Sequence, residues 1–376
     1  MSSAMPKTLE TQDMLLNMGP QHPSTHGVLR LMIRTDGEMV SEVTPVVGYL
    51  HRCAEKIGES LRYEQYVPYT DRMDYLSSMS DNLGFCLSVE RLMTVEIPER
   101  AKAIRVIMAE LNRIASHLLA FGTYGLDIGA FTPFLYAFRE REMILNMFEH
   151  VCGARLTYNY VKIGGVMRDV DKKFFEMVAN FLNVFDDRLK DYNELLSGNQ
   201  IFRERTLGLG VIPAKQALDW GLTGPNLRAS GVNYDVRKAM PYSGYEKYQF
   251  DVPIGHDRVG KLGDCWNRYW LRIEEMSESC KIVRQVMEGL PAGKFAADLR
   301  KIKPAAGEAY TAIENPRGEL GFYIISDGTE IPTRVKVRAP SFVNLAIMTE
   351  IGRDNLIADL IAILGSIDIV LGEIDR

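Results

Sequence analysis

The chain has 376 residues, of which 46% are hydrophobic and 25% are charged, and its formal net charge is −5. This composition is typical of a globular protein with a large core, and the acidic balance argues against nucleic-acid binding. The cysteines are odd in number and scattered, which fits a reducing compartment rather than a disulfide framework: Cys53, Cys86, Cys152, Cys265 and Cys280.

The first distinctive segment is GPQHPSTHGVLR, residues 19–30, which holds two of the six histidines, His22 and His26. Proline and glycine within it predict a loop rather than a helix. Residues 28–50 then alternate apolar and polar positions around Asp36-Gly37, which predicts a β-hairpin.

Helical spacing of apolar residues follows in four long segments, residues 98–122, 132–153, 169–196 and 261–289. Pro98 suits a first helical turn, and Asp169 is a plausible N-terminal cap of the third helix. Residues 198–258 are rich in Gly, Pro and Tyr, so we expect irregular structure there. Residues 308–340 alternate again between turn signals and predict a three-stranded meander.

The last apolar run, residues 355–372, contains Asp359 and Asp368. We therefore expect a helix buried in protein rather than a membrane span. The first 14 residues lack the apolar core of a signal peptide, so nothing there predicts export.

These elements predict an α+β architecture, a helical bundle with small antiparallel sheets contributed from both ends. We expect a β-rich segment with the histidine loop at 1–70, the bundle at 71–300, the meander at 301–345, and a C-terminal helix with a buried tail at 346–376.

Several common cofactor motifs are missing from the sequence. No two cysteines stand two residues apart, and there is no GxxxxGK[ST] phosphate loop. Gly208-Leu-Gly210 lacks the remainder of a dinucleotide fingerprint. His22 and His26 could form half of a metal site, but the sequence offers no third ligand nearby. We therefore expect this chain to bind no metal, nicotinamide or redox group of its own.

Seven motifs occur in order along the chain: GPQHPSTHGVLR, GYLHRCAEK, DRMDYLS, GLDIGAFTPF, CGAR, ENPRGELG and DIVLGEIDR. With them the sequence closely resembles the family of the 49-kDa (D-type) subunit of proton-pumping NADH:quinone oxidoreductase, respiratory complex I. That family descends from the large subunit of nickel–iron hydrogenases, so the resemblance implies a hydrogenase-like helical bundle.

The nickel ligands of a hydrogenase are two CxxC pairs, and the resemblance places their four positions on Asp74, Ser77, Val370 and Glu373. A soft, thiolate-bound metal cannot be held by these side chains. The scaffold therefore resembles an inherited one from which the metal chemistry has been removed, which argues against a hydrogenase.

Quinone reduction takes two electrons and two protons, and needs an apolar slot with donors for both carbonyl oxygens. The resemblance implies that His26 and Tyr75 bind the quinone headgroup and that Asp127 pairs with His26. A histidine pKa of roughly 6.5 suits proton donation near neutral pH, and a tyrosine pKa of about 10 keeps the phenol protonated. His22 is either a supporting partner of His26 or a further proton carrier.

Electrons must come from elsewhere, and the resemblance implies a 4Fe-4S cluster in the adjoining B-type subunit, with Arg52 and Arg72 beside it. The alternative is that both arginines form surface ion pairs. Other expected partners are the small C-type subunit, further peripheral-arm subunits and the membrane subunits through which quinone reaches the site. The expected location is peripheral, on the cytoplasmic side of a bacterial inner membrane, where quinone reduction is coupled to proton translocation.

Two alternative roles remain, a complex fed by ferredoxin or another donor, and an inert scaffold. The joint presence of His26, Tyr75 and Asp127 argues against a scaffold.

Two positions depart from the family: Cys53, where glycine is usual, and Thr157, where many ubiquinone-using members have histidine. Thr157 therefore hints at a lower-potential quinone such as menaquinone. His117, on an amphipathic helix, is interpreted as a structural histidine.

Overall fold

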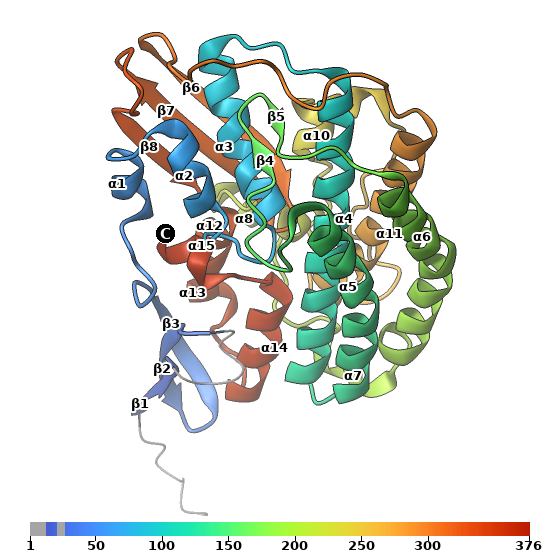
Figure 1. Ribbon diagram of the computed structural model, residues 1–376. Coiled ribbons are helices and arrows are strands. Elements are labelled where there is room, and N and C mark those ends of the chain that lie inside the picture. The colour runs from blue at the N-terminus through green and yellow to red at the C-terminus, as the bar shows by residue number, and fades with distance from the viewer. Residues whose placement is uncertain (1–12, 21–26) are drawn as a thin grey trace, which may run out of the picture.

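The computed structural model describes residues 13–20 and 27–376, and it consists of a helical bundle flanked by small antiparallel sheets (Figure 1). The sheets are β1-β2-β3 near the N-terminus, the short pair β4-β5, and β6-β7-β8 near the C-terminus. This arrangement confirms the predicted α+β class.

The N-terminal sheet contains the predicted hairpin. Its strands are β1 (Asp13–Met18), β2 (Arg30–Asp36) and β3 (Met39–Val46). Asp36 pairs with Met39 across a turn in which Gly37 has a φ of 63°, a left-handed conformation that favours glycine. Strand β1, which pairs with β2, was not predicted.

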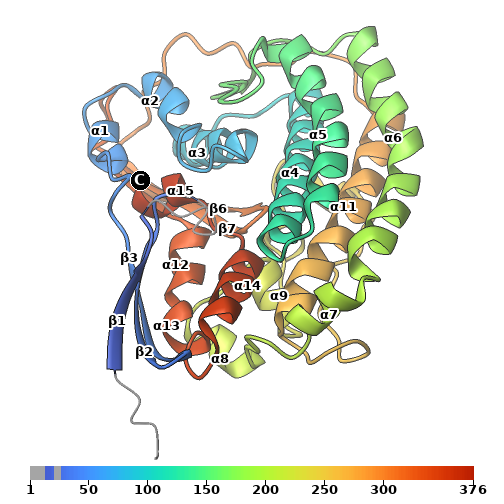
Figure 2. The same cartoon turned by 90° about the horizontal axis from the view of Figure 1, so that it is seen from below.

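The bundle is formed by α4 (Glu99–Asp127), α5 (Phe131–Cys152), α6 (Lys172–Tyr192) and α11 (Cys265–Glu288), which lie side by side in Figure 2. All four helices were predicted, although α4 extends beyond residue 122 to Asp127. Helix α3 (Ser78–Met93) lies between this bundle and the C-terminal sheet. Most side chains of α4 are buried, so this helix forms the centre of the molecule.

The sequence of α6 has the apolar spacing of an amphipathic helix. Buried Phe174, Val178, Phe181 and Phe185 recur at helical spacing and form one face, which packs into the main core. The predicted cap was wrong: the side chain of Asp171, rather than Asp169, accepts from the N–H of Phe174 at 2.8 Å. Asp169 instead accepts from Nε of Arg100 at 2.8 Å.

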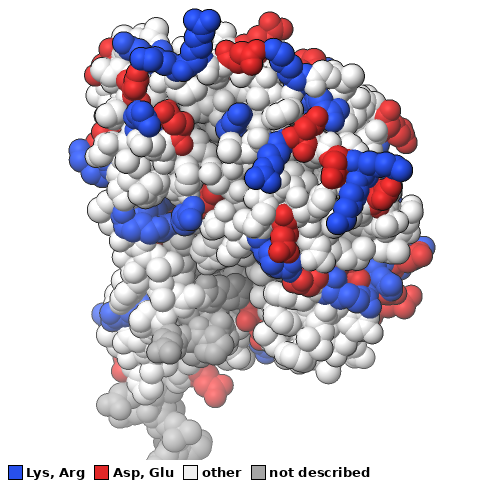
Figure 3. All heavy atoms as spheres, in the orientation of Figure 1, with Lys and Arg blue, Asp and Glu red and all other residues white. Residues whose placement is uncertain are grey.

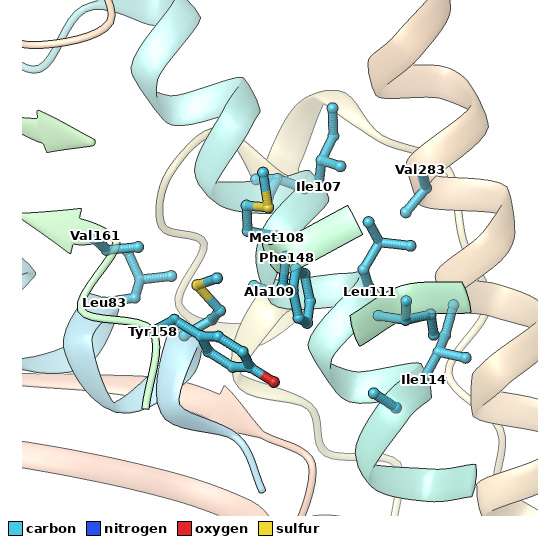
Figure 4. Packing of buried hydrophobic residues seen from close by; sticks show 14 of the residues in the cluster. Leu83, Ile107, Met108, Ala109, Leu111, Ile114, Phe148, Tyr158, Val161 and Val283 are labelled. Atoms are coloured by element: carbon cyan, nitrogen blue, oxygen red, sulfur yellow. The ribbon is translucent and has the colours of Figure 1, made fainter. Parts of the chain in front are cut away.

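The main hydrophobic core joins elements from distant parts of the chain, as Figure 4 shows. Leu83 of α3, Leu111 of α4, Phe148 of α5 and Val283 of α11 all contribute to it. Burial of this continuous apolar surface stabilises the bundle and fixes the ends of α3 and α4, which reach the site described below.

Several short elements connect the long helices. They are α1 (Ala54–Gly58), α2 (Tyr63–Thr70), β4 (Val161–Lys162), β5 (Gly165–Val166), η2 (Asn193–Ser197), α7 (Gln200–Thr206), α8 (Ala214–Asp219), α9 (Pro225–Ala229), α10 (Val236–Ala239) and η3 (Tyr245–Lys247). The description of residues 198–258 as irregular was therefore incomplete, because helical turns too short to show a periodic pattern occur there.

The predicted meander is confirmed as β6 (Gly307–Asn315), β7 (Gly318–Ser326) and β8 (Arg334–Arg338). The C-terminal part contains α12 (Pro340–Ala346), α13 (Met348–Ile351), α14 (Ile357–Ile367) and α15 (Leu371–Asp375). The apolar run is thus two helices, separated by 368–370. Asp368 ends α14 in a left-handed conformation.

Backbone hydrogen bonds connect the N-terminal part of the described chain with its C-terminal part. The N–H of Val40 in β3 donates to the carbonyl of Asn355 at 2.9 Å, just before α14. The N–H of Arg52 donates to the carbonyl of the last residue, Arg376, at 3.3 Å. The C-terminus accordingly lies beside α1 and α15 in Figure 2.

On the face shown in Figure 3, positive and negative side chains are interspersed. Ion pairs on the protein surface, such as Lys336 with Glu55 at 2.9 Å and Arg334 with Glu59 at 2.7 Å, mix the two signs locally. This face therefore presents no extended field of one sign that would attract a polyanion.

Candidate functional site

A pocket of about 260 Å³ lies where α4 ends, between the start of α3 and the segment linking α14 to α15. Its lining is mostly apolar, with a few polar groups: Tyr75, Leu76, Leu119, Thr123, Leu126, Asp127, Asp368, Ile369 and Val370. An apolar slot with a few convergent polar groups is typical of a small-molecule site. Two of the predicted site residues, Tyr75 and Asp127, share this pocket.

Tyr75 lies in the tight segment between α2 and α3 and is half-buried. Burial, with a further contribution from the neighbouring Asp74, raises the pKa of its phenol. The group therefore remains a proton donor at neutral pH. Gly372 allows α15 to approach this segment, because a Cβ there would lie 2.6 Å from the carbonyl oxygen of Met73 and 3.1 Å from the Tyr75 ring.

Asp127 is the last residue of α4. The C-terminal end of a helix carries a partial negative charge, so a positively charged partner beside Asp127 would be stabilised by both the carboxylate and the helix. On its other side, Gly365 of α14 permits close packing, since a Cβ on this glycine would lie 2.9 Å from Oδ2 of Asp127.

His22 and His26 lie outside the described residues. The chain resumes at Gly27, which lies against α15, where a Cβ on this glycine would be 3.0 Å from Cδ1 of Leu371. Leu371 follows Val370, a residue of the pocket wall.

The predicted pair Arg52 and Arg72 is brought together at the junction of α15 with the Tyr75 segment. Nη2 of Arg52 donates to the carbonyl oxygen of Arg72 and, at 3.2 Å, to that of Gly372. The Arg72 side chain is exposed, with its Nη1 bonded to the carbonyl of Pro68 at 2.5 Å and 3.7 Å from Oδ2 of Asp71. The Arg52 side chain and the Arg72 backbone thus meet beside Gly372, the residue that packs against the Tyr75 ring.

The four positions that resemble former nickel ligands are joined by hydrogen bonds in two pairs. Ser77 donates its N–H to the carbonyl of Asp74 at 2.8 Å, and Ser341 links the other two by donating its N–H to Glu373 and accepting the N–H of Val370. Within residues 13–20 and 27–376, no group of three or more His, Cys, Asp or Glu side chains is arranged to hold a metal ion.

Arg317 connects the two halves of this region. Its Nη1 lies 2.8 Å from Oδ2 of Asp74, and its Nη2 lies 3.3 Å from Oδ1 of Asp368. All three side chains are buried. Sequence reasoning noted Arg317 only as part of the ENPRGELG motif and missed this bridge, since no local pattern indicates which distant carboxylates an arginine will meet.

Proteins similar to this chain over nearly its full length are known. A family model described as respiratory-chain NADH dehydrogenase, 49 Kd subunit, matches residues 127–305 and 299–376. The D-type subunit of NADH-quinone oxidoreductase from Bacillus cereus is 53% identical over 369 residues, covering 98% of this chain and 100% of that relative. The corresponding protein of Chlorobium luteolum is 52% identical over 375 residues, covering 98% of this chain and 95% of that relative.

The chain belongs to this family. As a 49-kDa subunit it is one component of a multisubunit oxidoreductase rather than an enzyme by itself. Among the described residues, no helix of this 49-kDa-family chain is long and apolar enough to cross a membrane.

This member of the 49-kDa family also has a second buried polar network, next to the first. His117 bonds through Nε2 to Oε2 of Glu275 at 2.8 Å, and Glu275 pairs with Arg228 at 2.6 Å. Burial lowers the pKa of His117, although Glu275 opposes the shift, so the imidazole is neutral at pH 7. These contacts agree with the structural interpretation of His117.

Proposed function

We propose that this chain, together with a cluster-bearing neighbour, forms the site at which NADH:quinone oxidoreductase reduces quinone. The observation that carries the proposal is that Tyr75 and Asp127, which lie 52 positions apart in the sequence, line one apolar pocket. The relatives named as a component of NADH-quinone oxidoreductase support a quinone substrate.

The pocket suits a quinone headgroup rather than a whole quinone. Its volume of about 260 Å³ lies just below the ~300–1,000 Å³ of typical ligand sites. Leu76, Leu126 and Ile369 provide apolar surface for a ring. The long tail of a membrane quinone would then extend into space formed with neighbouring subunits, and the proposed neighbours there are the B-type subunit and the membrane subunits.

Two protons are needed for each quinone reduced to quinol. In this proposal, Tyr75 donates one through its hydroxyl and His26 donates the other, one to each carbonyl oxygen. Asp127 pairs with His26, and the carboxylate and the negative end of α4 both favour the imidazolium. His22 supports His26 or carries a further proton.

Loss of the His26 proton would remove a positive charge from beside Asp127. The resulting change in electrostatic balance would start the charge movement coupled to proton translocation. Quinone is a membrane-borne substrate, so the proposed location is peripheral, on the cytoplasmic side of a bacterial inner membrane.

The two electrons would come from a 4Fe-4S cluster in the B-type subunit. Arg52, whose guanidinium bonds the Arg72 backbone, and Arg72 itself form the proposed contact, where their positive charge would raise the reduction potential of the cluster. The C-type subunit and further peripheral-arm subunits complete the proposed assembly. A hydrogenase role is disfavoured because Val370 has no group that can bind a metal.

The test is Tyr75→Phe in the assembled complex, with NADH oxidation by quinone compared against oxidation by an artificial acceptor upstream. We expect quinone turnover to fall at least about 100-fold, the lower range for loss of a general acid, while upstream activity persists. The matched control is Tyr323→Phe, which removes a hydroxyl bonded to Glu308 on the meander. Unchanged quinone turnover in Tyr75→Phe would show that the reaction occurs elsewhere.

A further inference from the structure

Four buried carboxyl groups adjoin the pocket and are called here the carboxylate cluster: Asp74, Asp81, Asp368 and Glu373. Asp368 lies on the pocket wall. Asp74 precedes Tyr75 in the chain, and its N–H donates to Oδ2 of Asp81 at 2.8 Å. Glu373 is held by the N–H of Ser341 at 3.0 Å.

The cluster has fewer cations than carboxyls. Arg317 pairs with Asp74 and Asp368, and Arg272 lies 3.6 Å from the other oxygen of Asp368. In the part of the chain that the structure describes, no lysine or arginine forms an ion pair with Asp81 or Glu373. Full ionisation would therefore leave two uncompensated negative charges in the protein interior, which is strongly unfavourable.

Asp81 and Glu373 each also have one buried oxygen without a hydrogen-bond partner among the described residues, Oδ1 and Oε1 respectively. A buried carboxylate with an unsatisfied oxygen is costly, whereas a protonated carboxyl avoids the charge. The groups facing Asp81 are Asp74, Glu373 and Asp71, and those facing Glu373 are Asp74, Asp81 and Arg317. Acidic neighbours therefore predominate around both carboxyls, and Glu373 shares its one cation with Asp74 and Asp368.

Electrostatics agree with this geometry. Burial, and then the charge of Asp74, raise the pKa of Glu373 to about 8. Burial, followed by Asp74 and Glu373, raises the pKa of Asp81 well above its ordinary value. Glu373 therefore keeps its proton at pH 7. The pKa of Asp81 is shifted in the same direction by burial and by its acidic neighbours, while Asp74 and Asp368 share Arg317.

We propose that the carboxylate cluster holds two protons, on Asp81 and Glu373, and reprotonates Tyr75 of the quinone pocket after each turnover. The inference rests on the proposed quinone site. The Tyr75 O–H bond breaks as a quinol O–H bond forms, with both electrons coming from the neighbouring 4Fe-4S cluster. A proton from the carboxylate cluster then restores the phenol, and the carboxylate left behind regains a proton from water.

Asp81 and Glu373 supply protons to Tyr75 and do not contact quinone, so they are positioning residues rather than catalytic ones. The test variant is Glu373→Gln in the assembled complex, because glutamine has the shape of a protonated glutamate and keeps the acceptor for Ser341. The control is Glu278→Gln on α11, a buried glutamate that bonds instead to Lys281 and to the N–H of Asp251.

Redox-induced infrared difference spectra of the complex with bound quinone should contain the carbonyl band of a protonated carboxyl. We expect Glu373→Gln to remove part of that band and Glu278→Gln to leave it. At pH 7, Glu373→Gln should also slow quinone turnover several-fold, and it should weaken the decline of turnover as the pH rises through about 8, since the proton lost there belongs to Glu373.

Three results would overturn the proposal. They are an unchanged infrared band with an unchanged pH profile, loss of an ionised-carboxylate band instead, or failure of Glu373→Gln to assemble where Glu278→Gln assembles normally. The last would mean that Glu373 is ionised in the native protein. The infrared result reports protonation of Glu373 directly, so it is distinguishable from a failure of the quinone site, which Tyr75→Phe tests.

Discussion

Nη1 of Arg317 lies 2.8 Å from Oδ2 of Asp74, and both side chains are fully buried although 243 positions separate them in the chain. The same guanidinium reaches Asp368 on the pocket wall. Arg317 thus holds together the segment that presents Tyr75 and the segment that closes the pocket from the C-terminal side.

Replacing Arg317 with methionine should strongly destabilise the protein. The buried carboxylates would lose their main counter-charge, and breaking such a pair costs about 3–5 kcal/mol. The measurement is the amount of assembled complex and its thermal unfolding midpoint. Arg334→Met is the control, since its exposed pairing with Glu59 is expected to contribute only about 0–1 kcal/mol. Equal losses in the two variants would contradict the role given to Arg317.

Gly365→Ala should disturb the pocket by displacing Asp127, one of the residues that line it. A Cβ at this position would lie 2.7 Å from Cδ2 of the buried Tyr124 ring and 2.9 Å from Oδ2 of Asp127, so both side chains must shift. We expect a stability loss of about 1–3 kcal/mol from overpacking. Quinone turnover should fall more than electron transfer to an upstream acceptor.

Gly289→Ala provides the comparison for that change, because the nearest atom to its Cβ would be the Gln285 carbonyl oxygen at 3.6 Å. If Gly365→Ala reduces quinone and upstream activity in equal proportion, then the substitution acts on assembly and not on Asp127.

Asp71→Asn should change how stability depends on pH. Burial raises the pKa of Asp71 to about 7, although its hydrogen bonds and Arg72 oppose the shift. Between an unfolded pKa of about 3.9 and this folded value, the unfolded wild-type chain releases a proton that the folded chain keeps, so wild-type stability falls as the pH rises.

The asparagine variant lacks this titration. Its free energy of unfolding relative to wild type should therefore increase from pH 4 to about pH 7 and then level off. Thermal unfolding of both complexes across this range measures the difference. A constant difference between the two proteins would show that Asp71 is ionised throughout.

Arg52→Met should lower the reduction potential of the proposed neighbouring cluster, on the order of tens of millivolts, because a positive charge is removed. Redox titration of the cluster signal by electron paramagnetic resonance measures it. Arg52→Lys keeps the charge while losing the two-carbonyl contact to Arg72 and Gly372. If lysine and methionine lower the potential equally, then the effect comes from lost hydrogen bonds and not from charge.

The sequence by itself determined the local elements with strong periodicity. The Asp36-Gly37 hairpin, the four long bundle helices and the 308–340 meander all occur as predicted, because each pattern of apolar residues fits only one regular structure. The resemblance to the family placed the four nickel-ligand positions of a hydrogenase on residues other than cysteine, which predicts that thiolate-bound metal chemistry is missing. Tyr75 and Asp127 could be proposed from motifs alone.

Only the tertiary structure decided which of these residues meet. The pairing of Asp74 with Arg317 and Asp368 depends on long-range packing of α3, the meander and the C-terminal segment, and no local pattern encodes it. Asp171 rather than Asp169 caps α6 because the helix begins at Lys172, and Asp169 pairs with Arg100 instead. The surplus of buried carboxyls beside the pocket likewise exists only after folding, because burial and neighbouring charge, not residue type, determine whether an acid keeps its proton.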